Sequence, residues 1–600
     1  MSVLETPRIY FRGQMSWDPI VTNNYSQFYD EIDSQPVYPS TNDKVQAFRA
    51  EAIKSVVTRN WNPHGTHRST FFDSAISGAD LGSGCENGDP FVGSPANFVG
   101  MLVDLEPYGT ITSQLFFDAM SFGIAGGYRI AARRSSRITS RYINFFRNPY
   151  GPKAGIASVV WQTCFQKGDL RVDAFDSLAL QALQNALVDD DVLGITVQFN
   201  NYRTVYYNEL LKTNPEVAKP SRELQKKLEA GGFQPNPARS EMVGVIGLWR
   251  RGEPVNEPCD RTLIMAPDDP QQPPTIASAH ARLTRETIVL DFSNSVSEDN
   301  LELEKHDFGD LTLVAIHPVT GNATTLATFG FDHYDKAAYD ATSGVITLPL
   351  SVAADGELQL RNATGTVLLA EQSLRALPLI PNLYLNQGDT HVAEFQVYER
   401  GLPAGGDIEV TIYVMSADSG TIESSFTLTT DDDGKVSFPI TGTHGGITAY
   451  VSAAGPNPAP PSGGINPQTN TYMYVRTLSA DAEVAQLDPT WDNVYERVLA
   501  NWNAMAPCMD NWLNLADPSQ VYAFGAMIKK LTDSAAFENF RYMPVTRDLT
   551  PGERTLLYNF LNGDPPEPST AAAPQAEMMQ AAAPPEEPES LVKLNRRMRS

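Results

Sequence analysis

The chain has 600 residues, of which 42% are hydrophobic, and a formal net charge of −26 at pH 7. This length exceeds what one hydrophobic core can serve and predicts roughly three to five domains with ordinary globular interiors. The negative charge argues against nucleic acid and anionic membrane surfaces as general partners, because both repel an acidic protein.

The cysteines and the first residues bear on the cellular compartment. Cys85, Cys164, Cys259 and Cys508 are scattered and form no CxxC pair. This argues against a structural zinc site and a disulfide framework, and it favours a reducing compartment. The opening residues lack the basic and apolar parts of a signal peptide, and no apolar run has the length of a membrane span. We therefore expect a cytoplasmic protein.

Residues 1–262 are predicted to form a first, β-rich region. Ile9 and Phe11 alternate with polar residues in an opening strand. Two longer stretches, Asp189–Phe199 and Met242–Glu253, have the Val, Ile and Leu content of core strands. Their glycines should let a second backbone approach closely, at Gly194, Gly244 and Gly247.

One basic cluster stands out in this acidic chain. Its arginines, interleaved with Tyr and Phe, are Arg129, Arg133, Arg134, Arg137, Arg141 and Arg147. Guanidinium groups can hold a carboxylate-bearing ligand or an acidic partner through paired hydrogen bonds, and the first five are our candidate binding residues. The alternative is a solvated strand pair whose charge is balanced by nearby Asp and Glu.

Two further β regions are predicted after a Pro-rich linker at 254–274. Residues 276–378 carry short strands with Gly and Asn turns, which is typical of a β-sandwich. Residues 380–478 alternate in a similar way, and we interpret them as an immunoglobulin-like domain. Within them, Asp433-Gly434 between two strands predicts a β-hairpin, since glycine accepts the positive φ of such a turn. The predicted fold class is mainly β, with several antiparallel domains of the sandwich or immunoglobulin-like kind.

The hydrophobic period becomes helical over residues 486–562, which predicts a C-terminal helical cap. Helix starts are signalled by Asp488-Pro489, by Asp517-Pro518 and by the capping box of Thr550–Glu553. Residues 563–600 are rich in Pro, Ala and Glu and predict a disordered tail. The tail ends in a short basic segment that could dock onto a partner through Leu591, Leu594, Arg596, Arg597 and Met598.

The common catalytic motifs give no assignment. Gly-x-Ser-x-Gly, His-Glu-x-x-His and the phosphate-binding loop pattern do not occur in the sequence. His64 and His67 have i, i+3 spacing, but the Pro and Gly beside them oppose a helix, and two surface loop histidines are the plainer interpretation. We therefore name no catalytic residue, metal ligand or cofactor. A site assembled from distant segments stays open.

Four short segments carry a resemblance to a known family, in the same order along the chain. They are Pro7–Gly13, Leu187–Phe199, Met242–Glu253 and Tyr542–Leu549. Together they resemble the amino-terminal region of the bacterial VioB-type proteins, which include the iminophenylpyruvate dimer synthases and the chromopyrrolate synthases. In that family the chain continues into a ferritin-like domain that is thought to hold the chemistry.

The resemblance implies an auxiliary or scaffolding role for a chain that is not catalytic alone. Because the sequence stops before the ferritin-like domain, the oxidative chemistry is expected from a separate ferritin-like protein. Two alternatives stay open. One is a multidomain β structural or interaction protein with no link to indole pigment chemistry, and the other is a self-contained enzyme with an unrecognised site.

Overall fold

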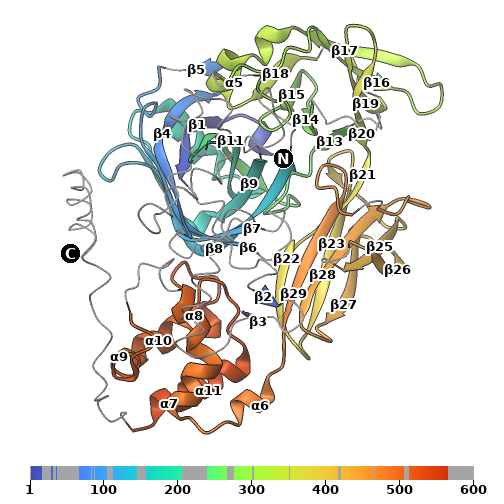
Figure 1. Ribbon diagram of the computed structural model, residues 1–600. Helices are drawn as coiled ribbons and strands as arrows, with labels where there is room; N and C mark the ends of the chain where they lie inside the picture. Colours follow the sequence, from blue (N-terminus) through green and yellow to red (C-terminus); the bar gives the residue numbers. More distant parts are fainter. Residues whose placement is uncertain are drawn as a thin grey trace.

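The computed structural model describes residues 2–16, 29–30, 35–36, 67–82, 84–86, 88–104, 113–144, 157–205, 239–265, 276–299, 303–350, 352–353, 355–416, 420–461, 464–505 and 513–564. Antiparallel sheets make up most of it, and helices follow at the C-terminal end (Figure 1), which confirms the predicted fold class. No helix in these ranges is long and apolar enough to cross a bilayer.

Eight antiparallel strands of the first region close on themselves, and we call this unit the closed sheet. Since β1 pairs with both β12 and β4, the ring of strands has no open edge. Short strands β5 (Cys85–Glu86) and β10 (Leu170–Asp173) pair with β4 and β8 at its margins. The ring runs in the order β1 (Arg8–Ser16), β12 (Arg239–Arg250), β11 (Val192–Val205), β9 (Ala157–Gln166), β8 (Arg129–Asn144), β7 (Ser113–Gly123), β6 (Ala96–Asp104) and β4 (Arg68–Asp80).

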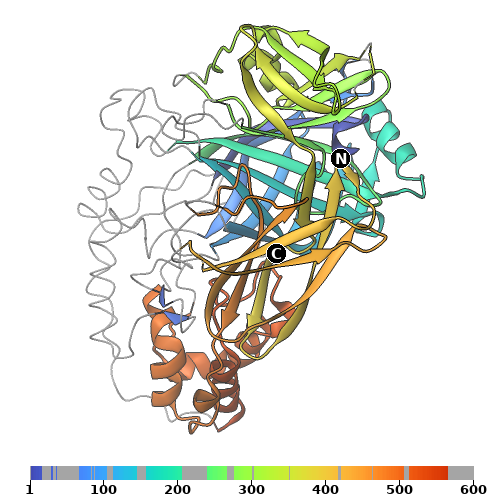
Figure 2. The same cartoon turned by 90° about the vertical axis from the view of Figure 1, so that its right-hand side faces the viewer.

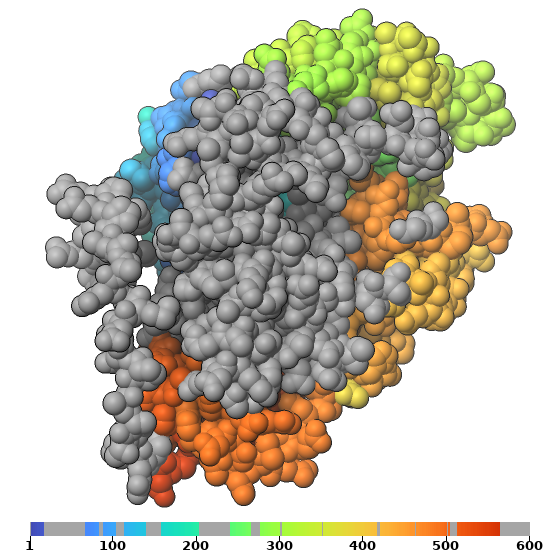
Figure 3. All heavy atoms as spheres, in the orientation of Figure 1, coloured from blue at the N-terminus to red at the C-terminus, as the bar shows by residue number. Residues whose placement is uncertain are grey.

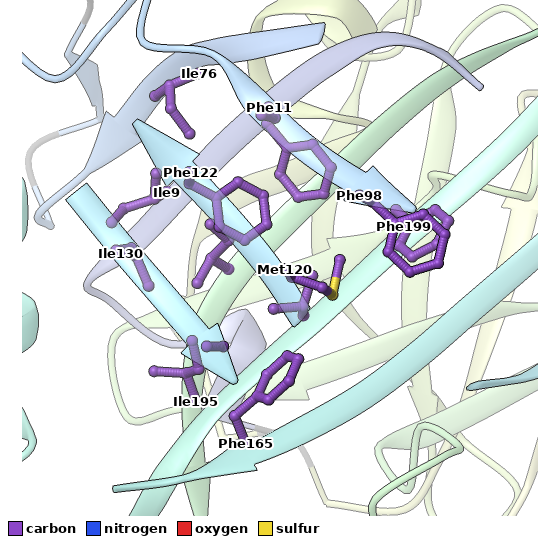
Figure 4. Close-up of a cluster of buried hydrophobic side chains, with 14 of the residues drawn as sticks. Ile9, Phe11, Ile76, Phe98, Met120, Phe122, Ile130, Phe165, Ile195 and Phe199 are labelled. Atoms are coloured by element: carbon purple, nitrogen blue, oxygen red, sulfur yellow. The ribbon is translucent and has the colours of Figure 1, made fainter. Parts of the chain in front are cut away.

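Aromatic side chains fill the inside of the closed sheet (Figure 4). Trp161 stacks on Phe199 with ring centroids 6.2 Å apart, and Phe199 also meets Phe98 at 6.2 Å. Helix α2 (Leu178–Ala186) begins at the N-cap Ser177 and adds Leu180 to the same core. The interior is thus a packed core, as in other small closed sheets.

The glycines of the central strands are required by close contacts. A Cβ on Gly194 would lie 1.8 Å from the backbone oxygen of Phe165, and one on Gly247 would lie 2.6 Å from Cα of Val3. At Gly244 the close neighbour is the ring of Phe11, at 2.2 Å, and not a backbone. The expected backbone approach therefore holds at two of these three positions.

The second β region is one continuous eight-stranded sheet. All eight strands contribute side chains to a single core, so the sheet folds over on itself. Its first strand lies within the stretch predicted as a linker. Helix α5 (Lys336–Thr342) covers one end. The order is β17 (Ala323–Phe329), β16 (Leu311–Ile316), β19 (Glu357–Asn362), β20 (Val367–Gln372), β13 (Arg261–Met265), β14 (Ala279–Leu283), β15 (Thr287–Asp291) and β18 (Val345–Pro349).

The third β region has two sheets that share one core. The first sheet contains β21 (Leu374–Pro378), β23 (Thr390–Glu399), β24 (Leu402–Pro403) and β27 (Lys435–Thr441). The second runs in the order β22 (Asn382–Asn386), β29 (Thr471–Leu478), β28 (Gly446–Ala454), β25 (Glu409–Ser416) and β26 (Ile422–Thr429), with β22 and β29 parallel. A separate short pair, β2 (Tyr29–Asp30) and β3 (Gln35–Pro36), also forms.

The hairpin predicted at Asp433-Gly434 is wrong in its pairing, although the turn forms. Gly434 has a φ of +74°, and its N–H donates to the carbonyl oxygen of Asp431 at 2.9 Å. However, β26 pairs with β25, whereas β27 pairs with β23 in the other sheet. Crossing to the opposite sheet allows β27 to bury its alternating apolar residues in the shared core, namely Val436, Phe438 and Ile440.

The C-terminal helices lie at the opposite end of the molecule from the second β region, as both ribbon views show (Figures 1 and 2). The predicted starts at Asp517 and at the Thr550–Glu553 capping box are confirmed. The N-cap predicted at Asp488 is wrong: Thr490 accepts from the N–H of Asn493 and opens the helix. The helices are α6 (Ala482–Ala485), α7 (Trp491–Val494), α8 (Ala500–Met505), α9 (Pro518–Ala523), α10 (Gly525–Leu531) and α11 (Pro551–Asn562).

Replacing Phe199 by Ala should destabilise the closed sheet by about 3–5 kcal/mol, because the fully buried ring would leave a cavity. Thermal unfolding followed by circular dichroism should show a lower midpoint for the transition that includes the closed sheet. Val319→Ala, at a side chain that is 87% exposed, is the control and should leave the midpoint unchanged. Equal midpoints for the two variants would contradict this core.

Candidate functional site

The outer face of the closed sheet is where the other regions pack. Val3 and Tyr10 are buried in one cluster with side chains of the second and third β regions, including Val289 and Tyr398. Arg8 is buried beside them. Its guanidinium donates to Asp80 Oδ2 at 2.5 Å, to Leu4 O at 2.8 Å and to Thr347 Oγ1 at 2.8 Å. A charged group thus joins the closed sheet to the second β region.

The segment Tyr542–Leu549 forms a second junction, between the helices and the closed sheet. Arg547 is fully buried, with its guanidinium carbon 3.4 Å from the ring centroid of Phe116 on β7. Its N–H groups donate to the carbonyl oxygens of Val545 at 2.8 Å and Asn539 at 3.1 Å. Burial lowers the pKa of Arg547 to about 10, so the side chain stays charged at neutral pH.

Two more side chains complete this junction. Arg476 of β29 donates to the carbonyl oxygen of Thr546 at 3.2 Å, and burial lowers its pKa to about 10. The ring of Tyr384 on β22 contacts that of Phe537 at 4.7 Å between centroids. The junction therefore holds the third β region as well as the helices and the closed sheet.

The arginines of the basic cluster have different environments along β8. Arg134 donates to the carbonyl oxygen of Cys164 at 2.8 Å, and Arg137 lies 3.4 Å from Glu538 Oε1, beside the junction. Arg133 is exposed and Arg129 is half-buried. Arg141 lies on β8 opposite Val160, and only its backbone is described. Arg147 lies outside the described residues.

The structure describes one member of the histidine pair. His67 is buried, which contradicts the expected surface position, and its Nδ1 lies 3.1 Å from the carbonyl oxygen of Leu102. Because a carbonyl oxygen only accepts, Nδ1 carries the hydrogen. Burial lowers the pKa of His67 to about 4, so the ring is neutral at pH 7. His64 and the tail residues proposed for docking lie outside the described residues.

A polar cavity of about 60 Å³ lies where the outer face of β11 and β9 meets the second β region and the 467–471 loop. Among its lining side chains, Gln198 of β11 donates to Asp291 Oδ2 at 2.7 Å, and the N–H of Ser293 donates to Asp291 Oδ1 at 2.9 Å. Asp291 is 5% exposed. The carboxylate is therefore held in place by hydrogen bonds from two regions of the chain.

A second set of lining groups is centred on Arg375. Its guanidinium forms an ion pair with Glu257 at 3.0 Å and donates to Thr262 Oγ1 at 2.8 Å. That hydroxyl donates to the carbonyl oxygen of Asp260 and lies 3.0 Å from His280 Nδ1. With its hydrogen already used, Thr262 can only accept from His280, so Nδ1 carries the hydrogen and Nε2 is an acceptor.

Sequence reasoning missed this cavity because its lining comes from several separate segments of the chain, between residues 160 and 471, none of which has a motif. The residues that the structure describes contain no group of three or more His, Cys, Asp and Glu that could hold a metal ion. The arrangement can bind a small polar group, and Asp291 and neutral His280 are among the lining groups able to accept hydrogen bonds from it.

Because His280 is neutral in the folded protein, the free energy of unfolding should depend on pH in the acid range. Burial and the nearby Arg375 charge lower its pKa from 6.5 to about 3. The unfolded chain therefore binds this proton first, so folding stability falls as the pH drops from about 6.5 towards 3. His280→Asn should flatten that fall by up to about 1.4 kcal/mol per pH unit in urea unfolding. His333→Asn, at an exposed ring, is the control, and parallel curves for wild type and His280→Asn would contradict the assignment.

Arg547→Met should loosen the helical region, because methionine keeps most of the volume but none of the hydrogen bonds. The three carbonyl oxygens that Arg547 bonds would lose their donor, at a cost of about 1–3 kcal/mol for each buried group left unpaired. Limited proteolysis should then cut within residues 513–564 several times faster than in the wild type. The exposed Arg541→Met variant is the matched control, and equal cleavage rates in the two variants would contradict the role of Arg547.

No protein-family model matches the chain. The chain is similar to the 2-imino-3-(indol-3-yl)propanoate dimerase of Chromobacterium violaceum, a VioB-type protein, with 27% identity over 415 residues. The alignment covers 64% of this chain and 35% of that protein, so the chain spans about a third of the length of the relative it matches.

Solved structures give weak likenesses. Domains 4 and 5 of the S-layer protein SbsC match 36% of this chain and 96% of that chain at 10% identity, with a TM-score of 0.12. The trypsin-activated α2-macroglobulin of Escherichia coli matches 78% of this chain and 29% of that chain at 11% identity, with a TM-score of 0.14. The distant similarity to a VioB-type protein therefore rests on the sequence match alone.

Proposed function

We propose that the chain is a scaffold for a separate, ferritin-like oxidative protein, in a system that couples imino acids. The proposal takes its chemistry from the similar Chromobacterium protein, whose name specifies a 2-imino-3-(indol-3-yl)propanoate dimerase. The scaffold is not catalytic alone in this proposal. It supplies a rigid multidomain surface, and the partner supplies the redox centre.

The observation that carries the proposal is the burial of Tyr542–Leu549. This segment resembles the family, yet its Arg547 is fully buried and bonded to backbone carbonyls at the junction of three regions. A substrate-contacting arginine would need access to a cavity or to solvent. The segment therefore acts by fixing the helices against the closed sheet, which is what a scaffold requires.

The helical region offers a surface for such a partner. Phe524, the N-cap of α10, and Met527, in its first turn, are 42% and 46% exposed. Exposed apolar side chains on a small helical unit are typical of interaction surfaces when they lie together. In the space-filling view the helical region forms one end of the molecule, away from the second β region (Figure 3). We propose that this end contacts the oxidative partner.

Arg133, on the closed sheet, is a second proposed contact for the partner and adds a positive charge. It is the exposed arginine of the basic cluster among those whose side chains are described, and it lies on the same strand as Arg137, which contacts the helical region through Glu538. An acidic or carboxylate-bearing partner group would be attracted to it, with an affinity that depends on salt.

The test combines purified chain with the Chromobacterium protein from which the region aligned with this chain has been removed. We expect the chain alone to leave 2-imino-3-(indol-3-yl)propanoate unchanged, and the mixture to convert it to the dimer. Chromatography and mass spectrometry measure the product. Phe524→Ser with Met527→Ser should weaken binding of the two proteins about tenfold or more in calorimetry, because an apolar contact is lost.

Control variants distinguish the loss of a binding contact from a general loss of folding. Leu402→Ser, at a side chain 62% exposed in the third β region, should leave binding unchanged. Arg133→Gln should flatten the salt dependence of binding, whereas Arg285→Gln, exposed in the second β region, should not. Turnover of the imino acid by the purified chain alone would contradict the scaffold proposal.

A further inference from the structure

The polar cavity beside Asp291 contains buried groups that need a ligand. Asn294 is 5% exposed, and neither its Oδ1 nor its Nδ2 has a hydrogen-bond partner among the described residues. Gln468 is 9% exposed, and its Oε1 is likewise unpartnered. Both residues line the cavity. Buried polar atoms are nearly always paired in folded proteins, so the unpaired oxygens indicate a bound group that donates hydrogen bonds.

The charge of the lining indicates the sign of that group. Three ionised side chains line the cavity, and two of them, Arg375 and Glu257, neutralise each other in an ion pair 3.0 Å long. Asp291 remains as one net negative charge. Each of its carboxylate oxygens accepts one bond, from Gln198 or Ser293, and has a lone pair left. Since His280 is neutral, no further positive charge compensates the carboxylate within the lining.

The volume limits the size of the group. About 60 Å³ is far below the ~300–1,000 Å³ of ordinary small-molecule sites. The cavity therefore suits a group of a few heavy atoms. Water alone would satisfy the two amide oxygens but would leave the Asp291 charge without a counter-charge.

We propose that this cavity binds a small cation that donates hydrogen bonds, either an ammonium ion or the ammonium head of a primary amine. Asp291 supplies the counter-charge. The unpartnered oxygens of Asn294 and Gln468 and the Nε2 of His280 accept the N–H groups. The site lies apart from the proposed partner surface on the helices. Cation binding is therefore independent of the scaffold role, and its test does not depend on that proposal.

Isothermal titration of the full chain at pH 7 and constant ionic strength tests the site, with ammonium chloride and methylamine hydrochloride as probes. Both should bind saturably, whereas sodium chloride should give no saturable heat. Gln468→Leu and Asp291→Asn should each lower the affinity for both probes about tenfold or more. The first removes an oxygen that accepts a hydrogen bond from the cation, and the second removes the negative charge that balances it. Gln486→Leu, at an exposed glutamine on the helical region, is the matched control and should bind like the wild type.

Three results would overturn the proposal. The first is the absence of saturable binding of either probe to the folded wild-type chain. The second is unchanged affinity in Gln468→Leu. The third is potassium chloride binding as tightly as ammonium, because that would make the cavity an oxygen-lined alkali-cation site with no preference for N–H donors. Circular dichroism establishes that each variant is folded. If Asp291→Asn does not fold, Gln468→Leu in the 467–471 loop still decides the matter.

Discussion

The closed sheet is buried inside and over much of its outer face, and the rest of the structure depends on this constraint. Inside, aromatic rings such as Phe199 and Trp161 fill the space. Outside, the second and third β regions and the helices cover the strands, so outward-facing polar groups lose contact with water. Each such group needs a protein partner, because an unpaired buried polar atom is costly. The outward residues Arg8, Gln162 and Gln198 accordingly bond to groups of other segments.

Buried charge is used in the same way at both junctions. Arg8 pairs with Asp80, and Arg547 uses backbone carbonyls and aromatic rings in place of a carboxylate. A guanidinium suits this role because its planar fork donates several bonds and its faces stack on rings. Removing either arginine would leave buried acceptors unpaired, so the junctions fix one arrangement of the regions. This rigidity, together with the similarity to a VioB-type protein, is the basis of the scaffold proposal.

Most local signals were predictable from the sequence, although the N-cap expected at Asp488 lies at Thr490, and long-range ones were not. The capping box at Thr550 and the N-cap at Asp517 depend on residues within one turn, and both form as expected. The turn at Asp433-Gly434 also forms, but its strands join different sheets, since pairing depends on which core buries Phe438. His67 and the cavity around Asp291 were missed for a similar reason. Their burial is created by segments far away in the chain, and no spacing rule records it.

The central claim is that the Tyr542–Leu549 junction and the closed sheet form one cooperative unit. Amide hydrogen exchange of the whole chain, read by mass spectrometry, tests it most directly. Peptides from Tyr542–Leu549 should exchange their amide hydrogens as slowly as those from β11. The reason is that the junction can open only when the helices separate from the closed sheet. Fast exchange at the junction while β11 stays protected would show that the helices are loosely attached, and it would contradict the account.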